Sequence, residues 1–274
     1  MKFKQIVEKR FTEWKDNGFC QEAVILNKRI RERNNRIIDN YFDTANPGAF
    51  TGKLDSEVVL VHLNPKRDKN GKEPWGKKCE EDFDTYWDRH VNFGEKKYGK
   101  DVLKKEKSKF DLKQIRFLKH FGIFDFNNDK DNPFHDLVEV MQKKLQLDLV
   151  PFGSPNFDYN VIGVENLKPF VETILDLIFE YKNKRKYIIF CGRVFEKILT
   201  DADFIIKEKT KIYPDHLPKK IGGITKNLYS VIVVTLKYKN SEITACIAPQ
   251  FAQQGCPIDE YGKFVYKSFN TYTN

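Results

Sequence analysis

The chain has 274 residues, of which 40% are hydrophobic and 14% aromatic, which is enough for a sizeable core. These proportions argue against an intrinsically disordered chain. The chain carries 48 basic and 39 acidic residues, a formal net charge of +9. This excess of positive charge favours a polyanionic partner, nucleic acid first among them.

Neither a membrane span nor a metal site is indicated. The longest apolar runs, such as residues 58–63 and 187–191, are far shorter than the roughly 18 to 20 residues that cross a bilayer. Residues 1–15 lack the apolar stretch of a secretory signal, so we expect a cytoplasmic protein. The five cysteines stand far apart without a C-x-x-C pair, which argues against a disulfide framework or a zinc ribbon. An iron–sulfur cluster held by four of them is an alternative, but we expect no metal and no cofactor.

The first part of the chain reads as two helices followed by a buried strand. Helical patterns cover residues 3–14 and 23–41, and the turn residues around Pro47 end them. Residues 58–63 form a continuous β-branched and apolar run, which is typical of a central strand buried on both faces. This strand must end near Pro65, because proline has no N–H to donate to the sheet.

A charged stretch over about residues 66–110 contains several glycines and aromatic residues, and we interpret it as a partly helical insertion. Its mixed charge is typical of a solvated face. The alternative is that its interleaved aromatic rings and lysines contact a strand of DNA.

The rest of the chain alternates between helices and strands. Helical patterns cover residues 113–120, 134–145, 164–181 and 194–199, and apolar runs predict strands at 145–152, 187–191, 230–238 and 242–247. Such alternation predicts an α/β protein with three layers, α/β/α, around a central and mostly parallel sheet. No repeat or low-complexity linker divides the chain, so we expect one domain over residues 1–274, opened by N-terminal helices over about residues 1–50.

Three loops that follow predicted strands carry unusual polar and aromatic residues. Ligands of open α/β sheets bind beyond the carboxyl ends of the strands, so these loops are the natural place for a site. The three loops are His62–Lys66, Leu147–Ser154 and Cys246–Gly255.

The order of these features resembles the uracil-DNA glycosylase superfamily over about residues 52–255: a strand with an Asn-Pro loop, a strand with an aromatic loop, a strand-Gly-helix turn, and a strand with a Pro-rich loop. The resemblance implies that fold, DNA as the partner, and a monofunctional DNA glycosylase. Such an enzyme flips a base and hydrolyses its N-glycosidic bond, leaving an abasic site. Asn64 matches the Asn of the family's Asn-Pro motif and would orient the attacking water. We expect a monomer.

The resemblance places base recognition on the second loop. Asp148 stands where the family has Asn, and an ionised carboxylate only accepts hydrogen bonds, so we expect a cytosine-type modified base rather than plain uracil. Phe152 would stack on the extruded base, and we also assign Ser154 and His62 to base recognition. The alternative for Asp148 is that it caps a turn. Superfamily members that act on hypermodified phage DNA suggest a role in antiviral defence.

DNA contacts are expected in the loops around the site. The residues that we assign to them are Lys66, Arg67, Gly192, Arg193, Pro249, Gln250, Phe251, Gln253 and Gln254. The third loop has Ala248-Pro249-Gln250 where the family usually has His-Pro-Ser, so the catalytic histidine is missing. A catalytically silent DNA-binding protein with the same fold is therefore the alternative hypothesis.

Overall fold

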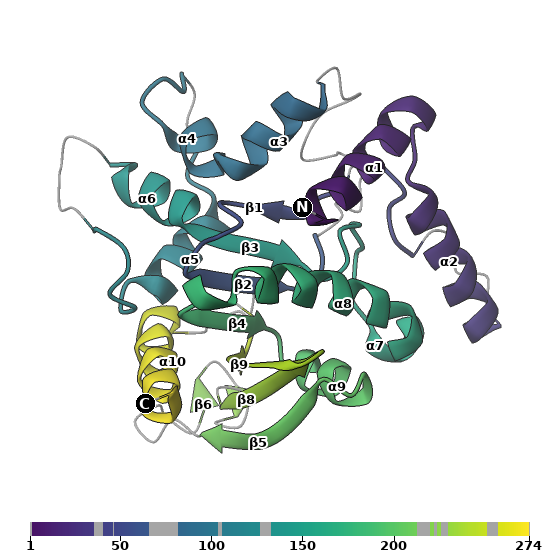
Figure 1. Ribbon diagram of the computed structural model, residues 1–274. Coiled ribbons are helices and arrows are strands. Elements are labelled where there is room, and N and C mark those ends of the chain that lie inside the picture. Colours follow the sequence, from purple (N-terminus) through teal and green to yellow (C-terminus); the bar gives the residue numbers. More distant parts are fainter. Residues whose placement is uncertain are drawn as a thin grey trace.

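In the computed structural model of the chain, a central sheet lies between two groups of helices (Figure 1). The structure describes residues 2–35, 41–45, 47–65, 82–103, 106–126, 133–212, 220–221, 224–225, 230–250 and 257–273, and all structural statements concern these residues.

Within the described residues, seven strands form one sheet in the order β1-β3-β2-β4-β9-β8-β5 (Figure 1). The pairings of β3 with β2, β2 with β4 and β4 with β9 are parallel, and the three outer pairings are antiparallel. The expectation of a mostly parallel sheet is thus confirmed for its centre. The strands span Phe50–Thr51 (β1), Val58–His62 (β2), Lys144–Asp148 (β3), Tyr187–Cys191 (β4), Ile205–Ile212 (β5), Val231–Tyr238 (β8) and Ser241–Ala248 (β9), and a separate pair joins Lys220–Ile221 (β6) to Ile224–Thr225 (β7).

The predicted central strands β2 and β4 are confirmed, and every residue in both is buried. Successive side chains of a strand point to opposite faces. In β2, Val59 and Val61 belong to one hydrophobic cluster, whereas Val58 and Leu60 belong to another. A continuous apolar run is what a strand covered on both faces requires.

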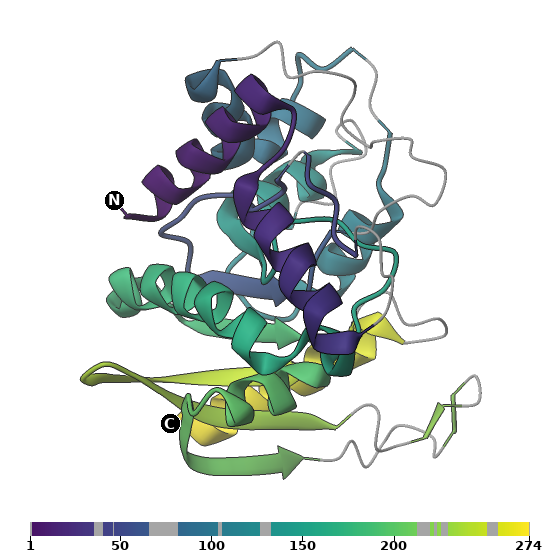
Figure 2. The same cartoon turned by 90° about the vertical axis from the view of Figure 1, so that its right-hand side faces the viewer.

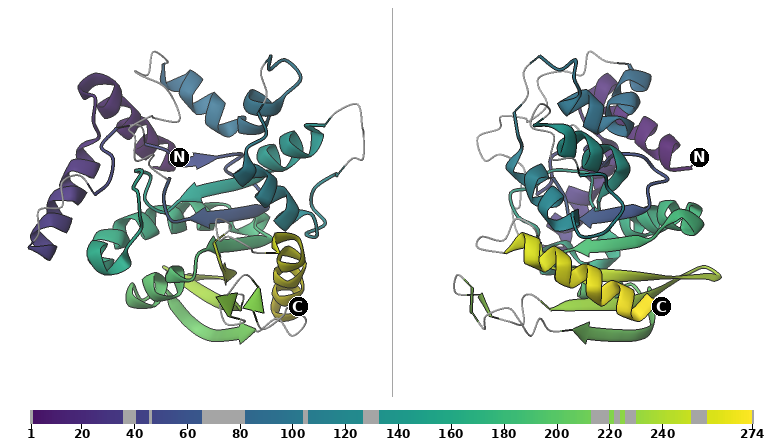
Figure 3. Two further views of the ribbon diagram at one scale, coloured as in Figure 1. Left: turned by 180° about the vertical axis from the view of Figure 1, so that it is seen from behind. Right: turned by 90° about the vertical axis from the view of Figure 1, so that its left-hand side faces the viewer.

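Helices cover both faces of the sheet, with α8 on one side and α10 on the other (Figures 2 and 3). The first group comprises α1 (Lys2–Asn17), α2 (Gln21–Asn34), α7 (Tyr159–Ile162), α8 (Val164–Glu180) and α9 (Val194–Asp201), and a 3-10 turn at Lys182–Lys184 follows α8. The second group comprises α4 (Phe93–Tyr98), α5 (Lys109–Leu118), α6 (His135–Lys143) and α10 (Ile258–Thr273), while α3 (Phe83–Val91) contacts α1, α4 and β1. In the described ranges, no helix combines the length and the apolar character needed to cross a bilayer.

Two predicted elements end earlier than their patterns suggest. The second helix ends at Asn34, and the next residue, Asn35, adopts a left-handed conformation with φ 47°. The strand predicted to reach residue 152 ends at Asp148. The chain nevertheless continues beside the loop after β2, because Leu149 N donates to His62 O at 2.8 Å and Val150 N donates to Leu63 O at 2.9 Å.

The edge strands β1 and β5 and the C-terminal helix α10 are not predicted from the sequence. In α10, Gly262 interrupts the helical pattern because glycine is a poor helix former. The structure gives the reason for this glycine: a Cβ there would lie 2.0 Å from the backbone oxygen of Phe117 in α5. Gly262 thus allows two helices to approach closely.

Candidate functional site

The carboxyl ends of the four central strands meet at one edge of the sheet (Figure 1). His62 at the end of β2 is in register with Asp148 at the end of β3, and Cys191 at the end of β4 is in register with Ala248 at the end of β9. The loops that follow these residues therefore start side by side. This is the edge at which open α/β sheets bind ligands.

Asn64 lies in the first of these loops and is held by the second. Its side-chain Nδ2 donates to Pro65 O at 2.8 Å, to Ser154 Oγ at 2.9 Å and, more weakly, to Phe152 O at 3.4 Å. Two of these acceptors are backbone carbonyls, which can only accept, so they fix the orientation of the amide. The other amide atom, Oδ1, accepts no hydrogen bond from any described residue.

Ser154 connects the same two loops. It is 2% exposed, its backbone N donates to Pro65 O at 3.1 Å, and its hydroxyl accepts from Asn64 while donating to Asn156 O. The hydroxyl is therefore engaged as both donor and acceptor. The structure places Ser154 as a support for Asn64.

Asp148 carries a carboxyl group that makes no side-chain hydrogen bond to a described residue. Burial raises its pKa to about 7, and the opposing attraction of the Lys144 ammonium limits the rise. Both the neutral and the ionised form are consequently populated near neutral pH. The expectation of an acceptor-only carboxylate applies above pH 7, whereas the neutral form also donates.

His62 is buried beside Asp148, and its ring lies 5.2 Å from that of Phe110 in an edge-on arrangement. Burial, aided by the positive charge of Lys144, lowers the pKa of His62 to about 3. The imidazole is therefore neutral at physiological pH. A neutral imidazole has one donor and one acceptor nitrogen.

Phe152 lies in the core rather than at the surface of the loop. Its side chain is fully buried and meets the ring of Phe170 edge-on at 6.4 Å. The ring cannot stack on a base in this conformation, so such a role requires the loop after β3 to rearrange.

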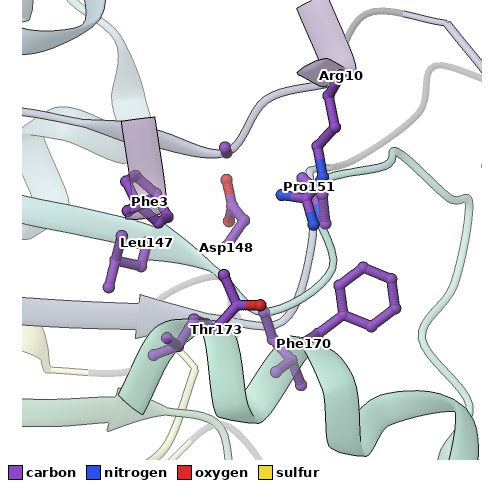
Figure 4. Close-up of a pocket in the computed structure, with 10 residues that line it drawn as sticks. Phe3, Arg10, Leu147, Asp148, Pro151, Phe170 and Thr173 are labelled. Atoms are coloured by element: carbon purple, nitrogen blue, oxygen red, sulfur yellow. The ribbon is translucent and has the colours of Figure 1, made fainter. Parts of the chain in front are cut away.

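Two cavities lie beside helices of the first group. The smaller, of about 10 Å³, is lined by Asp148, Arg10 and Phe170 among others (Figure 4), and it has room for roughly one water molecule. The larger, of about 400 Å³, lies between α1, α2 and α8 and shares Arg10, Phe170 and Thr173 with the smaller one. The cavity that touches Asp148 is therefore too small to hold a base.

The loops that follow β4 and β9 bring together further residues that we expected to contact DNA. Gly192 N donates to Ala248 O at 2.7 Å, and a Cβ at Gly192 would lie 3.4 Å from Gln250 Cγ. Gln250 is exposed and Pro249 is buried. Arg193 is committed elsewhere: its guanidinium donates to both oxygens of Ser230, at 3.0 Å each, and to Glu196 at 3.3 Å.

Five residues assigned to DNA contact, Lys66, Arg67, Phe251, Gln253 and Gln254, lie outside the described residues. The described part of the insertion over about residues 66–110 contains α3 and α4 and the start of α5, so its partly helical character is confirmed there.

Sequence reasoning missed Lys144, the first residue of β3. Its side chain is fully buried, and its Nζ donates to Gln146 Oε1 at 3.0 Å. Burial lowers its pKa to about 8, so it remains mostly charged at neutral pH. A lysine that follows Lys143 reads as solvated, and no sequence signal places it in the core.

Among the described residues, no three His, Cys, Asp or Glu side chains are grouped as a metal ion would require. The geometry defines the coarse class: an α/β protein with a mostly parallel sheet and a polar site at its carboxyl edge. Comparisons of the chain with protein-family models, curated proteins and solved structures found no match.

Proposed function

We propose that the chain is a monofunctional DNA glycosylase whose reaction centre lies at the carboxyl edge of the sheet. One observation carries the proposal: three acceptors hold the Asn64 amide through Nδ2, leaving Oδ1 without a hydrogen bond from a described residue. A fixed acceptor of this kind can bind one hydrogen of a water molecule and aim its oxygen. The net charge of +9 favours DNA as the partner.

The reaction is a hydrolysis at the sugar C1′ atom. The C1′–N bond to the base lengthens, positive charge develops on the sugar, and the water oxygen forms the new bond to C1′. The departing base nitrogen keeps the bonding electron pair and takes up a proton. Orientation of the water and electrostatic support for the developing charge are the main contributions that a protein makes to such a step.

Asp148 is the residue that we propose reads the base. Its ionised form accepts hydrogen bonds from the exocyclic amino group of a cytosine-type base. Its neutral form can accept from that amino group while its O–H donates to the ring nitrogen N3. Both forms suit cytosine or a modified cytosine, and removal of such bases from foreign DNA would be a defence function.

A catalytically silent DNA-binding protein is the second candidate. Two points favour it: Ala248-Pro249 stand where the family that the chain resembles has a histidine, and Phe152 is buried. Because the two candidates share DNA binding, only base release separates them.

The test is abasic-site formation, scored by alkaline cleavage, on DNAs carrying uracil, thymine mismatches, hydroxymethylcytosine or its glucosylated form. Asn64→Ala should abolish base release while retaining salt-sensitive DNA binding. Asn34→Ala is the matched control, because Asn34 Nδ2 also donates to two backbone carbonyls, Ile30 O and Val161 O, but lies on α2. Absence of abasic sites on every DNA would refute the glycosylase and leave the silent binder.

A further inference from the structure

A cluster of polar side chains, two fully buried and one half-buried, lies on one face of β3 beneath the proposed site. Gln146 Oε1 accepts hydrogen bonds from Lys144 Nζ at 3.0 Å and from Gln114 Nε2 at 3.1 Å. Lys144 and Gln114 are both fully buried. The Lys144 ammonium has three donors, and its bond to Gln146 is the one that it makes to a described residue.

The direction of the Lys144 side chain places its charge near the strand end. Residues 144, 146 and 148 share one face of β3, because side chains alternate along a strand. The bond from Nζ to Gln146 means that the side chain runs along this face toward Asp148. His62, in register with Asp148 on the neighbouring strand, also experiences the charge of Lys144.

Charged and titratable groups face the Lys144 ammonium from several elements. They are Asp148 on β3, His62 on β2, Cys191 on β4, Asp111 on α5 and Lys97 on α4. Asp111 is already engaged, since its Oδ2 accepts from Lys97 Nζ at 2.9 Å and from Tyr98 Oη at 2.6 Å. Asp148 is therefore the acidic group in this set that has no hydrogen bond to a described residue.

A buried ammonium with one hydrogen bond is a poor source of stability. Transfer of such an ion from water is unfavourable, and apolar replacements of buried charges are often neutral or stabilising. A role other than stabilisation accounts better for its position beneath Asp148 and His62.

We propose that Lys144 is a positioning residue for base recognition: its buried ammonium, directed along β3 toward Asp148, makes that side chain a hydrogen-bond acceptor and so favours bases that present an amino group. The inference concerning bases rests on the proposed function; the interaction between the two side chains does not.

The directions in which burial and Lys144 shift the pKa of Asp148 support this role. Burial raises the pKa of Asp148, and Lys144 opposes the rise. Without the ammonium, the carboxyl would be more fully protonated at neutral pH. A protonated carboxyl donates a hydrogen bond, which also suits the carbonyl oxygen beside the N–H group of uracil.

The first experiment is a carbon NMR titration of the Asp148 carboxyl in the whole protein, with Asp148→Asn to assign the signal. Lys144→Met should raise the midpoint by about one pH unit. Lys97→Met is the matched control, since it removes a cation of the same cluster that has no interaction with Asp148. An unchanged midpoint in Lys144→Met, or an equal shift in Lys97→Met, would overturn the proposal.

A reciprocal measurement keeps the proposal testable if Lys144→Met does not fold. Asp148 raises the pKa of Lys144, so Asp148→Asn should lower the Lys144 midpoint, followed through its side-chain carbon next to Nζ. A Lys144 titration that is the same in both proteins would contradict the proposed coupling.

The last experiment connects Lys144 to specificity. The ratio of cytosine-type to uracil base release should fall in Lys144→Met, because the neutral carboxyl is the form that also binds uracil. If the Asp148 midpoint moves from about 7 to about 8, the neutral fraction at pH 8 rises about fivefold and the ratio falls by the same factor. Lys144→Arg should restore the ratio. An unchanged ratio in a protein that releases bases overturns the specificity role. If the wild-type protein releases no base, the glycosylase proposal fails, and the two titrations still decide whether Lys144 controls Asp148.

Discussion

Replacing Asn64 by Asp tests the structural basis of the proposed water-orienting residue. The substitution keeps the size and shape of the side chain but exchanges an NH2 group, which donates, for an oxygen that accepts. In the structure this group faces Pro65 O at 2.8 Å and Ser154 Oγ at 2.9 Å. The introduced oxygen would meet a carbonyl that cannot donate, in a loop that is half-buried.

The expected loss of unfolding free energy follows from the hydrogen bonds that Asn64 Nδ2 no longer makes. A buried partner left unsatisfied costs about 1 to 3 kcal/mol. Unfavourable charge in the half-buried loop adds to this, so Asn64→Asp should lose about 3 kcal/mol of unfolding free energy at pH 8. Asn64→Ala removes the same bonds without adding a charge, and it should lose about 1 to 2 kcal/mol.

Urea unfolding followed by far-ultraviolet circular dichroism measures both variants. Two acceptors face the introduced carboxyl, so we expect its pKa to be raised and its protonated form to favour the folded state. The destabilisation of Asn64→Asp should therefore be smallest near pH 4 and grow as the pH rises. A variant as stable as the wild type at pH 8 would show that Nδ2 does not face these acceptors, and the assignment of Oδ1 to water would fall.

Two further substitutions test other parts of the structure. Asp148→Asn should have a larger unfolding free energy than the wild type above pH 7. Because folding raises the pKa of Asp148 from about 4 to about 7, its contribution to stability is complete below pH 4 and is lost as the pH rises through about 7. A gain in unfolding free energy that persists at pH 4 would contradict the burial of this carboxyl. Gly262→Ala should lower the unfolding free energy by about 2 kcal/mol, although alanine favours helices, because its Cβ would lie 2.0 Å from Phe117 O. A variant whose thermal unfolding midpoint equals or exceeds that of the wild type would refute this contact.

The sequence predicts the centre of the fold better than its edges. β2 and β4 are continuous apolar runs, and a strand buried on both faces is the structure that such short runs favour. β5 mixes isoleucines with lysines, which is how edge strands are protected from pairing with other chains, and the pattern therefore predicts no strand.

The candidate site is predictable in part. Asn64 and Ser154 follow predicted strands, and the parallel pairing of β2 with β3 brings them together as the position of the loops indicates. The burial of Phe152 depends on packing against Phe170, and that of Lys144 on the path of its side chain along β3. Neither is encoded in local sequence, because both depend on which face of an element meets which neighbour.

The strand order also determines when the site can form during synthesis. β2 emerges from the ribosome early but lies between β3 and β4, and the partners of Val58 on these strands, Lys144 and Tyr187, follow about 86 and 129 positions later. The loop at Gly192 gains its neighbours only after β9, the last strand of the sheet, has been made. Until then the growing chain leaves the backbone N–H and C=O groups on one edge of β4 unpaired, and such an edge can pair with strands of other chains.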